Sequence, residues 1–289
     1  MSRTELVRTH ALTPRGRRRI VIGALLTVLV AMTALASTAT AGHRPQATKH
    51  HHAKPTIVLV HGAWADGSGW NDVIKRLQRA GYPVRVPPNP LRSLPGDSAT
   101  LKSFIATVPG PLILVGHSYG GAVITNAATG DPDVKALVYV DAFAPEKGET
   151  IFALTGADSA LAGDPTTLFD FVPYPGGPDG DVDLYLKENV FLTSFANGVP
   201  TRKAKELYAT QRPFALSVGS QESGEPAWRT IPSWYLLGTR DRIITPEAQR
   251  FMAERAGSTI VRVRAGHLSL ISHPDAVAKL IVRADRGTR

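Results

Sequence analysis

A serine held between glycines is the first residue whose surroundings could support chemistry. Residues 111–121 read P-L-I-L-V-G-H-S-Y-G-G, in which an apolar run is followed by G-x-S-x-G around Ser118 and then by small residues. This pattern predicts a buried strand that turns so sharply into a helix that the serine adopts a strained, positive-φ conformation. Gly116 and Gly120 suit the turn because a Cβ at either position would clash across it. We therefore predict that Ser118 is a nucleophile; the alternative is a glycine-rich turn that only packs a helix against a sheet.

A nucleophilic serine requires a base that removes its proton and an anion that orients the base. His267 follows the last apolar strand pattern of the sequence, and Asp241 follows the pattern before it. Since parallel strands place their carboxyl ends at one edge of a sheet, both side chains are expected at the same edge as Ser118. Asp141, which follows the run 134–140, is a rival for the role of the acid. We favour Asp241; the alternative for this carboxylate is an ion pair with a neighbouring arginine.

The other histidines could replace His267 as the base, or could bind a metal. His273 is the nearest competitor in the sequence, but it fits the N-cap of a helix better, and His117 and His61 are expected to face the protein interior. The run at residues 50–52 could bind a metal through imidazole, but it lies in a polar stretch that supplies no fixed geometry. We therefore predict that the protein needs neither a metal nor a cofactor.

Two backbone amides are expected to stabilise the negative charge that develops on an attacked carbonyl oxygen. The N–H of Tyr119 opens the predicted helix after the serine, where the first amides have no acceptor within the helix. The second donor should come from the loop after the first strand, which reads H-G-A-W at residues 61–64. Gly62 lets the backbone turn closely, so that the N–H of Ala63 can point at the same oxygen. The alternative is a turn that only positions Trp64.

Alternating strand and helix patterns must hold these residues in place. Continuous apolar runs rich in β-branched residues predict buried strands, and apolar residues at i, i+3, i+4 and i+7 predict helices between them. This alternation implies parallel βαβ units. The expected strands cover residues 56–60, 82–86, 112–115, 134–140, 233–237 and 259–263, and the expected helices lie near 70–80 and 98–107, from the serine to 129, from 245 and from 273.

The alternation stops between residues 145 and 230. Loops rich in glycine and proline mix there with short apolar and aromatic pieces, and only residues 201–210 resemble a helix. A segment of this length between two strands is expected to form a cap. Most of its aromatic residues should pack the cap onto the body, and a few should line an apolar pocket. The sequence thus predicts an α/β fold for residues 56–289, with a mostly parallel central sheet, helices on both faces and an inserted cap at about 145–230.

The first 41 residues have the three parts of a signal peptide. A basic stretch at 15–19 precedes the uncharged apolar run 20–36, and Ala39-Thr40-Ala41 is a small-x-small cleavage site. We predict cleavage before Gly42, a polar linker at 42–55, and a secreted or extracytoplasmic protein. The alternative is an uncleaved leader that anchors the chain in a membrane, which would be its one contact with a membrane. N-terminal sequencing of the mature protein distinguishes the two.

Charge and cysteine content exclude several classes of function. The chain has 33 Lys and Arg, 24 Asp and Glu, and no cysteine, which rules out disulfides, Cys-zinc sites and a thiol nucleophile. The first 41 residues hold six of the basic residues and one of the acidic ones, which leaves 27 against 23, or +4, for the rest. This balance does not predict binding to nucleic acid.

The motifs together resemble one superfamily. V-L-V-H-G-A-W, V-G-H-S-Y-G-G, the Asp241 loop and G-H-L-S-L-I-S-H-P-D-A-V look like the α/β-hydrolase superfamily, over roughly residues 55–289. More narrowly, the chain is similar to the serine carboxylesterases that include plant methylesterases and hydroxynitrile lyases, and to actinobacterial α/β hydrolases. The resemblance implies Ser118 as nucleophile, His267 as base, Asp241 as acid, and Ala63 and Tyr119 as oxyanion donors.

The same resemblance separates the alternative reactions. Hydroxynitrile lyases of this branch carry a lysine directly after the catalytic histidine, where this chain has Leu268. Epoxide hydrolases and haloalkane dehalogenases carry an aspartate in place of Ser118. We predict a serine carboxylesterase whose partner is a small-molecule ester. A lyase or a perhydrolase on the same triad, and a binding protein on an inactive hydrolase fold, remain as alternatives.

Overall fold

The computed structural model of this protein describes residues 53–289. The predicted signal peptide at 1–41 and nearly all of the predicted linker at 42–55 lie outside the described residues. None of the helices formed by residues 53–289 combines the length and the apolar character needed to cross a bilayer.

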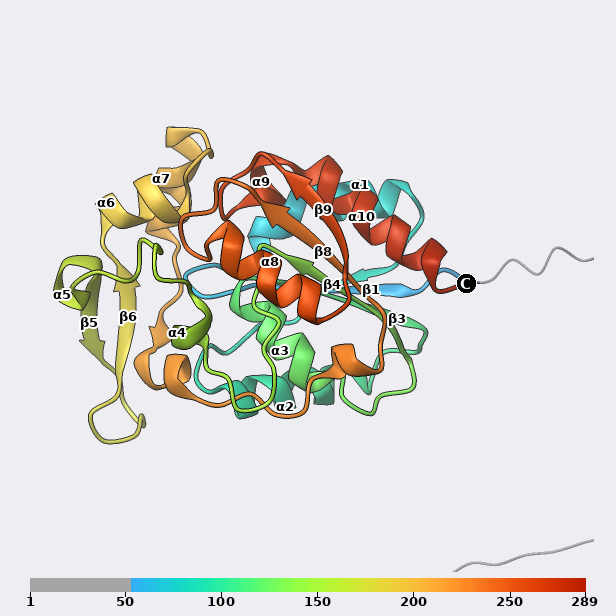
Figure 1. The fold of residues 1–289 in the computed structure, drawn as a ribbon, viewed down its shortest axis with the longest axis horizontal. Coiled ribbons are helices and arrows are strands. Elements are labelled where there is room, and N and C mark those ends of the chain that lie inside the picture. Colours follow the sequence, from blue (N-terminus) through green and yellow to red (C-terminus); the bar gives the residue numbers. More distant parts are fainter. Residues whose placement is uncertain (1–52) are drawn as a thin grey trace, which may run out of the picture. The chain divides into compact units, whose positions relative to one another are not determined.

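A six-stranded parallel sheet forms the centre of the fold (Figure 1). Its strand order is β2-β1-β3-β4-β8-β9, and every pair of neighbours is parallel. Apolar side chains bury β1, β3, β4 and β8 on both faces, as expected for parallel strands covered by helices. The strands are β1 (Thr56–Val60), β2 (Val84–Arg85), β3 (Leu112–His117), β4 (Val134–Val140), β8 (Ser233–Gly238) and β9 (Thr259–Val263).

Helices cover both faces of this sheet. Helices α1 (Asn71–Arg79) and α10 (Pro274–Gly287) pack together on one face, while α2 (Leu94–Ile105), α3 (Tyr119–Ala127) and α8 (Pro246–Arg255) lie on the other (Figure 1). This division follows from the right-handed crossovers that connect parallel strands. The predicted fold class is therefore confirmed.

Most predicted elements of the body lie where the sequence indicated, and two do not. Helix α2 begins at Leu94 rather than near residue 98, because Ser93 caps it by accepting a hydrogen bond from the Gly96 amide and Pro95 is tolerated in a first turn. Strand β2 is limited to Val84–Arg85, since the prolines on either side have no N–H to donate to the neighbouring strand.

The segment at residues 145–230, which we call the cap, contains a sheet that the sequence did not reveal. Strands β5 (Phe169–Pro173), β6 (Val182–Leu186) and β7 (Phe214–Ala215) form a three-stranded antiparallel sheet. The predicted helix is present as α7 (Thr201–Ala209). The remaining elements are short: α4 (Ile151–Leu154), α5 (Pro165–Leu168), α6 (Glu188–Val190), the π-helical turn Phe191–Phe195 and the 3-10 turns Leu216–Ser220 and Ala227–Arg229.

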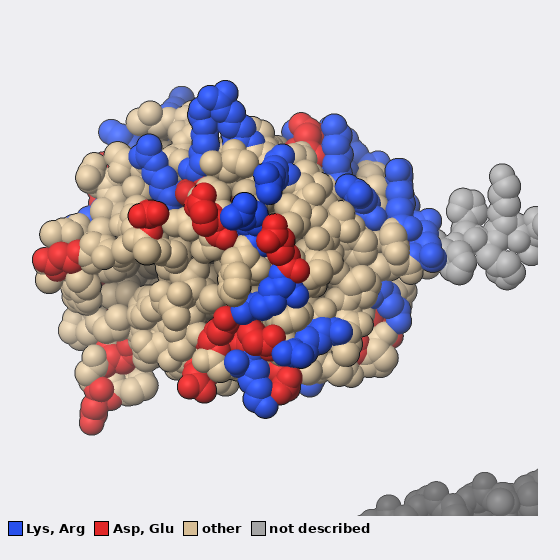
Figure 2. All heavy atoms as spheres, viewed as in Figure 1, with Lys and Arg blue, Asp and Glu red and all other residues tan. Residues whose placement is uncertain are grey.

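The carboxyl ends of the body strands meet at one edge of the sheet, and the cap lies beside that edge (Figure 1). Trp64, in the loop after β1, joins the two: its Nε1–H donates to Leu184 O in β6, and its ring packs on Phe169, Phe195 and Phe214 of the cap. On the face drawn in Figure 2, basic and acidic side chains are interspersed over the body. Because the candidate residues Ser118, Asp241 and His267 follow the carboxyl ends of β3, β8 and β9, they lie near the boundary between body and cap.

Candidate active site

Ser118 lies at the sharp turn that the sequence predicts between β3 and α3. Its backbone has φ 53° and ψ −126°, a left-handed conformation that non-glycine residues seldom adopt. The turn tolerates no extra atoms: a Cβ on Gly116 would lie 2.5 Å from Gly120 O, and one on Gly120 would lie 2.5 Å from Val60 O. The strain lifts the serine hydroxyl above the end of the sheet, at the N-terminus of a helix.

Three side chains from the ends of three strands form a continuous hydrogen-bonded relay. His267 Nε2 lies 2.9 Å from Ser118 Oγ, and His267 Nδ1 lies 2.8 Å from Asp241 Oδ2. Asp241 can only accept a hydrogen bond from the ring, so Nδ1 carries the proton and Nε2 is left to accept the proton of Ser118. This is the arrangement in which a histidine acts as a general base toward a serine.

Burial sets the protonation state of the imidazole. His267 is fully buried, and this burial lowers the pKa of its ring to about 3. A neutral ring at physiological pH is the form that can remove a proton from Ser118.

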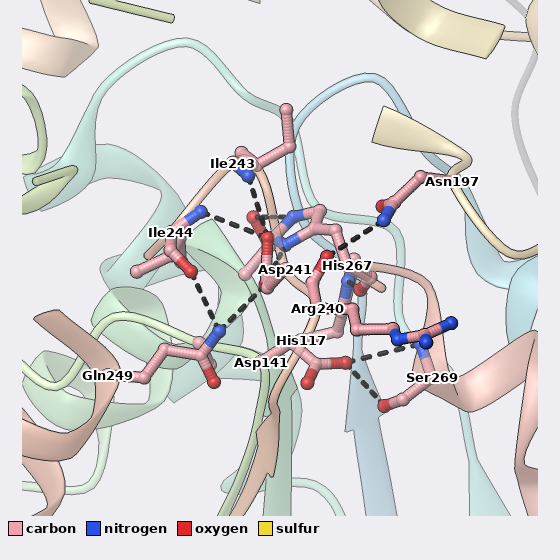
Figure 3. A network of polar contacts seen from close by, with 12 residues as sticks. His117, Asp141, Asn197, Arg240, Asp241, Ile243, Ile244, Gln249, His267 and Ser269 are labelled. Atoms are coloured by element: carbon pink, nitrogen blue, oxygen red, sulfur yellow. Dashed lines mark hydrogen bonds and ion pairs between the residues drawn. The ribbon is translucent and has the colours of Figure 1, made fainter. Parts of the chain in front are cut away.

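Asp241 lies among hydrogen-bond donors. Its Oδ1 accepts the amides of Ile243 and Ile244, and its Oδ2 accepts Gln249 Nε2–H at 2.7 Å in addition to His267 Nδ1–H (Figure 3). Burial raises the pKa of Asp241, and the donors from Ile243, Ile244 and Gln249 oppose that rise. Because all four hydrogen-bond partners of Asp241 are N–H donors, they favour its ionised, carboxylate form.

The rival acid, Asp141, contacts a different partner. It follows β4 at φ 45°, and its Oδ2 accepts hydrogen bonds from the hydroxyl and the amide of Ser269. Within residues 53–289, no hydrogen bond connects Asp141 with His267. The structure thus brings Asp241, and not Asp141, to the imidazole.

The two predicted oxyanion donors flank the serine. A Cβ on Gly62 would lie 2.6 Å from Ser118 Cβ, so the loop after β1 passes directly against the serine and continues into Ala63. Tyr119 is the first residue of α3, so its N–H has no acceptor within the helix. In the described part of the chain, neither the Ala63 amide nor the Tyr119 amide donates to a protein acceptor. Both remain available to a ligand oxygen.

The other histidines support the site without joining the relay. His117 Nε2–H donates to the carbonyl oxygen of His267 at 2.9 Å, and His61 bonds with Gly62 O and the Asn89 amide. His273 stands at the N-cap position of α10 as predicted, but its side chain makes no capping bond and contacts Ser272 instead. Among residues 53–289, no three acidic or histidine side chains gather as ligands for a metal.

Gln249 is a polar residue at the site that the sequence analysis did not identify. It lies one helical turn after Thr245, whose side chain caps α8, and is fully buried. The sequence signal that could have identified Gln249 is a polar residue one turn into a capped helix, on the helix face that packs against the sheet. Its Nε2 also bonds with Ile244 O, so Gln249 fixes the loop that carries Asp241.

A small apolar cavity lies between the loop after β1, the segment after His267 and the cap, and none of the three relay side chains lines it. The volume of this cavity is only about 20 Å³, enough for about one water molecule. Ser118 itself is 2% exposed. Ser118 is therefore almost inaccessible to solvent in this conformation. The lining side chains include Trp64, His117, Phe191, Phe195, Leu268 and Ile271.

The comparisons with known proteins agree with the observed fold. The profile of the "Alpha/beta hydrolase family" matches residues 57–280. A carbendazim hydrolyzing esterase from Nocardioides sp. is 42% identical over 111 residues, which cover 34% of this chain and 46% of that enzyme, so the match spans about half of its length. A pyrethroid hydrolase from Sphingobium wenxiniae is 28% identical over 246 residues, or 78% of this chain and 85% of that one. The solved structure of an extracellular alpha/beta-hydrolase from a Paenibacillus species superposes with a TM-score of 0.65 at 23% identity, over 80% of this chain and 98% of that one, which shows a common fold.

Proposed function

We propose, from the premise that this chain belongs to the alpha/beta hydrolase family, that it hydrolyses small carboxylic esters through a serine acyl-enzyme. The observation that carries the proposal is the relay from Ser118 Oγ through His267 to Asp241, at 2.9 and 2.8 Å. The relatives named for hydrolysis of carbendazim and of pyrethroids support the reaction class.

The proposed reaction proceeds in two balanced halves. Ser118 Oγ attacks the ester carbonyl carbon while its proton passes to His267 Nε2, and the Ala63 and Tyr119 amides donate to the resulting oxyanion. Asp241 stabilises the imidazolium, which then gives its proton to the departing alcohol oxygen. Water repeats the sequence on the acyl-enzyme with His267 as base, and releases the acid and the serine hydroxyl.

The cap and its apolar cavity suggest the kind of ester. Trp64, Phe195 and Leu268 present rings and alkyl groups beside the relay, so we propose a substrate with an apolar group next to its ester. Because Ser118 is only 2% exposed, residues around the site must shift before such a group can reach its hydroxyl. Leu268 also supplies no cation, which disfavours the lyase reaction that needs one to stabilise cyanide.

A set of p-nitrophenyl esters of graded chain length tests the proposal, with Ser118→Ala as the matched variant. We expect turnover by the wild type, labelling of Ser118 by a fluorophosphonate probe, and a loss of about 10³- to 10⁶-fold in kcat for Ser118→Ala, since the triad acts as a unit. A folded wild type with neither label nor turnover would contradict the proposal and favour a binding protein. Cyanide release from mandelonitrile without ester turnover would instead favour the lyase.

A further inference from the structure

Asp141 is a fully buried acid beside the relay for which the proposed reaction has no use. It lies directly after β4, in the left-handed region of the backbone at φ 45°. Non-glycine residues seldom adopt such a conformation, and it persists where the surrounding structure requires it. The position of this side chain therefore calls for a physical explanation.

One oxygen of Asp141 fixes the loop that carries His267. Its Oδ2 accepts the Ser269 amide at 3.2 Å and also the Ser269 hydroxyl (Figure 3). Ser269 is fully buried and follows His267 by two residues. Asp141 thereby connects the end of β4 with the segment that holds the imidazole against Ser118.

The other oxygen of Asp141 lies near carbonyl oxygens. Asp141 Oδ1 has no hydrogen-bond partner within the described part of the chain, although it is buried. A Cβ built on Gly238 would lie 2.7 Å from this oxygen, 3.0 Å from Ala265 O and 3.1 Å from Gly266 O, so the three oxygens border the same small space. Carbonyl oxygens can only accept. Ala265 O already accepts the Arg240 amide, but no hydrogen bond within residues 53–289 reaches Gly266 O, so a proton on Oδ1 would supply the donor that Gly266 O lacks.

The charged and titratable groups around Asp141 also favour its neutral form. Burial is the largest cause that raises the pKa of Asp141, and the neighbouring Asp241 carboxylate raises it further, while the donors of Ser269 and the Gly238 amide act against both. Tyr235 also faces it, and the uncharged His267 ring lies beyond hydrogen-bonding distance. No lysine or arginine side chain among residues 53–289 pairs with it.

The two buried acids thus differ in the charge that their surroundings can hold. Asp241 accepts four N–H donors, including the imidazole. Asp141 accepts hydrogen bonds from Ser269 on one oxygen, while its other oxygen makes no hydrogen bond of normal geometry and lies near two carbonyl oxygens, with the Gly238 amide as a weaker opposing donor. Since two adjacent buried carboxylates do not both ionise readily, the single negative charge belongs on Asp241.

We propose that Asp141 keeps its proton at neutral pH and acts as a positioning residue. Its carboxyl group holds the His267 loop through Ser269 and leaves Asp241 as the only anion next to the imidazole. This proposal rests on the proposed function, because the loop it positions carries the proposed base.

A matched pair of variants tests the proposal. Asp141→Asn keeps an acceptor for Ser269 and places N–H donors toward the carbonyls, so we expect kcat within about threefold of wild type and a superimposable pH profile of kcat/KM. Asp141→Ala removes the contact, and we expect a 10- to 100-fold lower kcat with KM little changed, because a displaced base costs rate rather than binding. An infrared difference spectrum of wild type against Asp141→Asn at pH 7 should contain the C=O stretch of a protonated carboxyl group.

Three results would overturn the proposal. One is a shift of the acid limb in Asp141→Asn by more than about half a pH unit, which means that a negative charge was removed near His267. Another is a wild type without the protonated-carboxyl band, and the third is a folded Asp141→Ala with full activity. The infrared band does not depend on turnover: its presence in a wild type that hydrolyses no ester would support the protonated Asp141 and reject only the proposed function.

Discussion

The edge of the central sheet and the cap beside it bury their residues in different ways. At the sheet edge, His61, His117, His267, Asp141 and Asp241 are all buried and are held by hydrogen bonds with defined partners. The cap contains no histidine; its aromatic rings pack around Trp64, and hydrogen bonds of Ser159, Thr193 and Asn197 join it to residues 240–243. Hydrogen bonds fix distances and angles, whereas apolar contacts are not directional. The arrangement at the edge suits the proposed reaction, and the apolar contacts around Trp64 suit the shift that the proposed ester substrates require.

Three of the four most exposed large apolar side chains among residues 53–289 belong to the cap, and the fourth, Phe251, lies on α8 of the body. Phe152, Phe171 and Val172 of the cap are 46%, 41% and 43% exposed, although β5 carries two of them. A sheet of three short strands buries little area of its own. We infer that the cap is the less stable region, and that substitutions there should change access and affinity before they change the chemical step.

The largest test of this contrast removes the charge at the sheet edge. Asp241→Asn keeps the size of the side chain but cannot hold the imidazole in the tautomer that leaves Nε2 free, so we expect kcat to fall about 10⁴-fold with KM little changed. Stopped-flow or steady-state assays with p-nitrophenyl esters measure the change. Asp141→Asn is the matched control, since it makes the same substitution in the second acid. Equal losses in both variants would mean that the two acids share one role.

Sequence reasoning reached the edge of the sheet but missed the antiparallel sheet inside the predicted cap, for a physical reason. The family, the fold class and the strands at 134–140 and 259–263 are confirmed with the bounds that their apolar runs predict. Strand β4 is buried on both faces and β9 lies at the edge of the sheet, but both carry continuous runs rich in β-branched residues, so their own residues identify them. The β5-β6-β7 sheet depends on pairs such as Leu184 with Phe214, which are distant in the sequence and are not marked by alternation. The roles of Gln249 and Ser269 likewise depend on where two loops meet, which no local pattern records.

A smaller effect is expected from the contact that joins the two regions. Trp64→Phe removes the Nε1–H that bonds with Leu184 O at 2.9 Å but keeps an aromatic ring. A buried hydrogen bond is worth about 1 kcal/mol, so we expect a roughly three- to tenfold change in KM for longer esters and little change in kcat for p-nitrophenyl acetate. Kinetics on the ester series, together with limited proteolysis of the cap, measure both consequences.

Trp228→Phe provides the control for this change. Trp228 Nε1–H donates to Pro145 O at 3.0 Å, so the variant loses the same kind of bond, but Trp228 does not line the cavity. We expect it to lower stability to a similar extent and to leave KM unchanged across the series. If Trp228→Phe altered KM as much as Trp64→Phe does, the cap would respond to any loss of stability and the contact at Trp64 would have no particular role.

The last prediction concerns stability at acid pH rather than activity. Acid should act on the sheet edge, because the cap has no histidine to protonate. Burial lowers the pKa of His117 well below the usual value of 6.5. Below pH 6.5 the unfolded chain protonates this ring and the folded protein does not, so stability falls as pH falls, by about 1.4 kcal/mol per pH unit for one such group. His117→Gln keeps a donor for His267 O and cannot titrate. We expect its free energy of unfolding, measured with urea, to fall less steeply between pH 6 and pH 5 by about that amount. At pH 8 the ring of His117 is neutral in both the folded and the unfolded protein, so the difference in stability between wild type and variant at that pH reports packing alone. Equal slopes of stability against pH in the two proteins at acid pH would contradict the prediction.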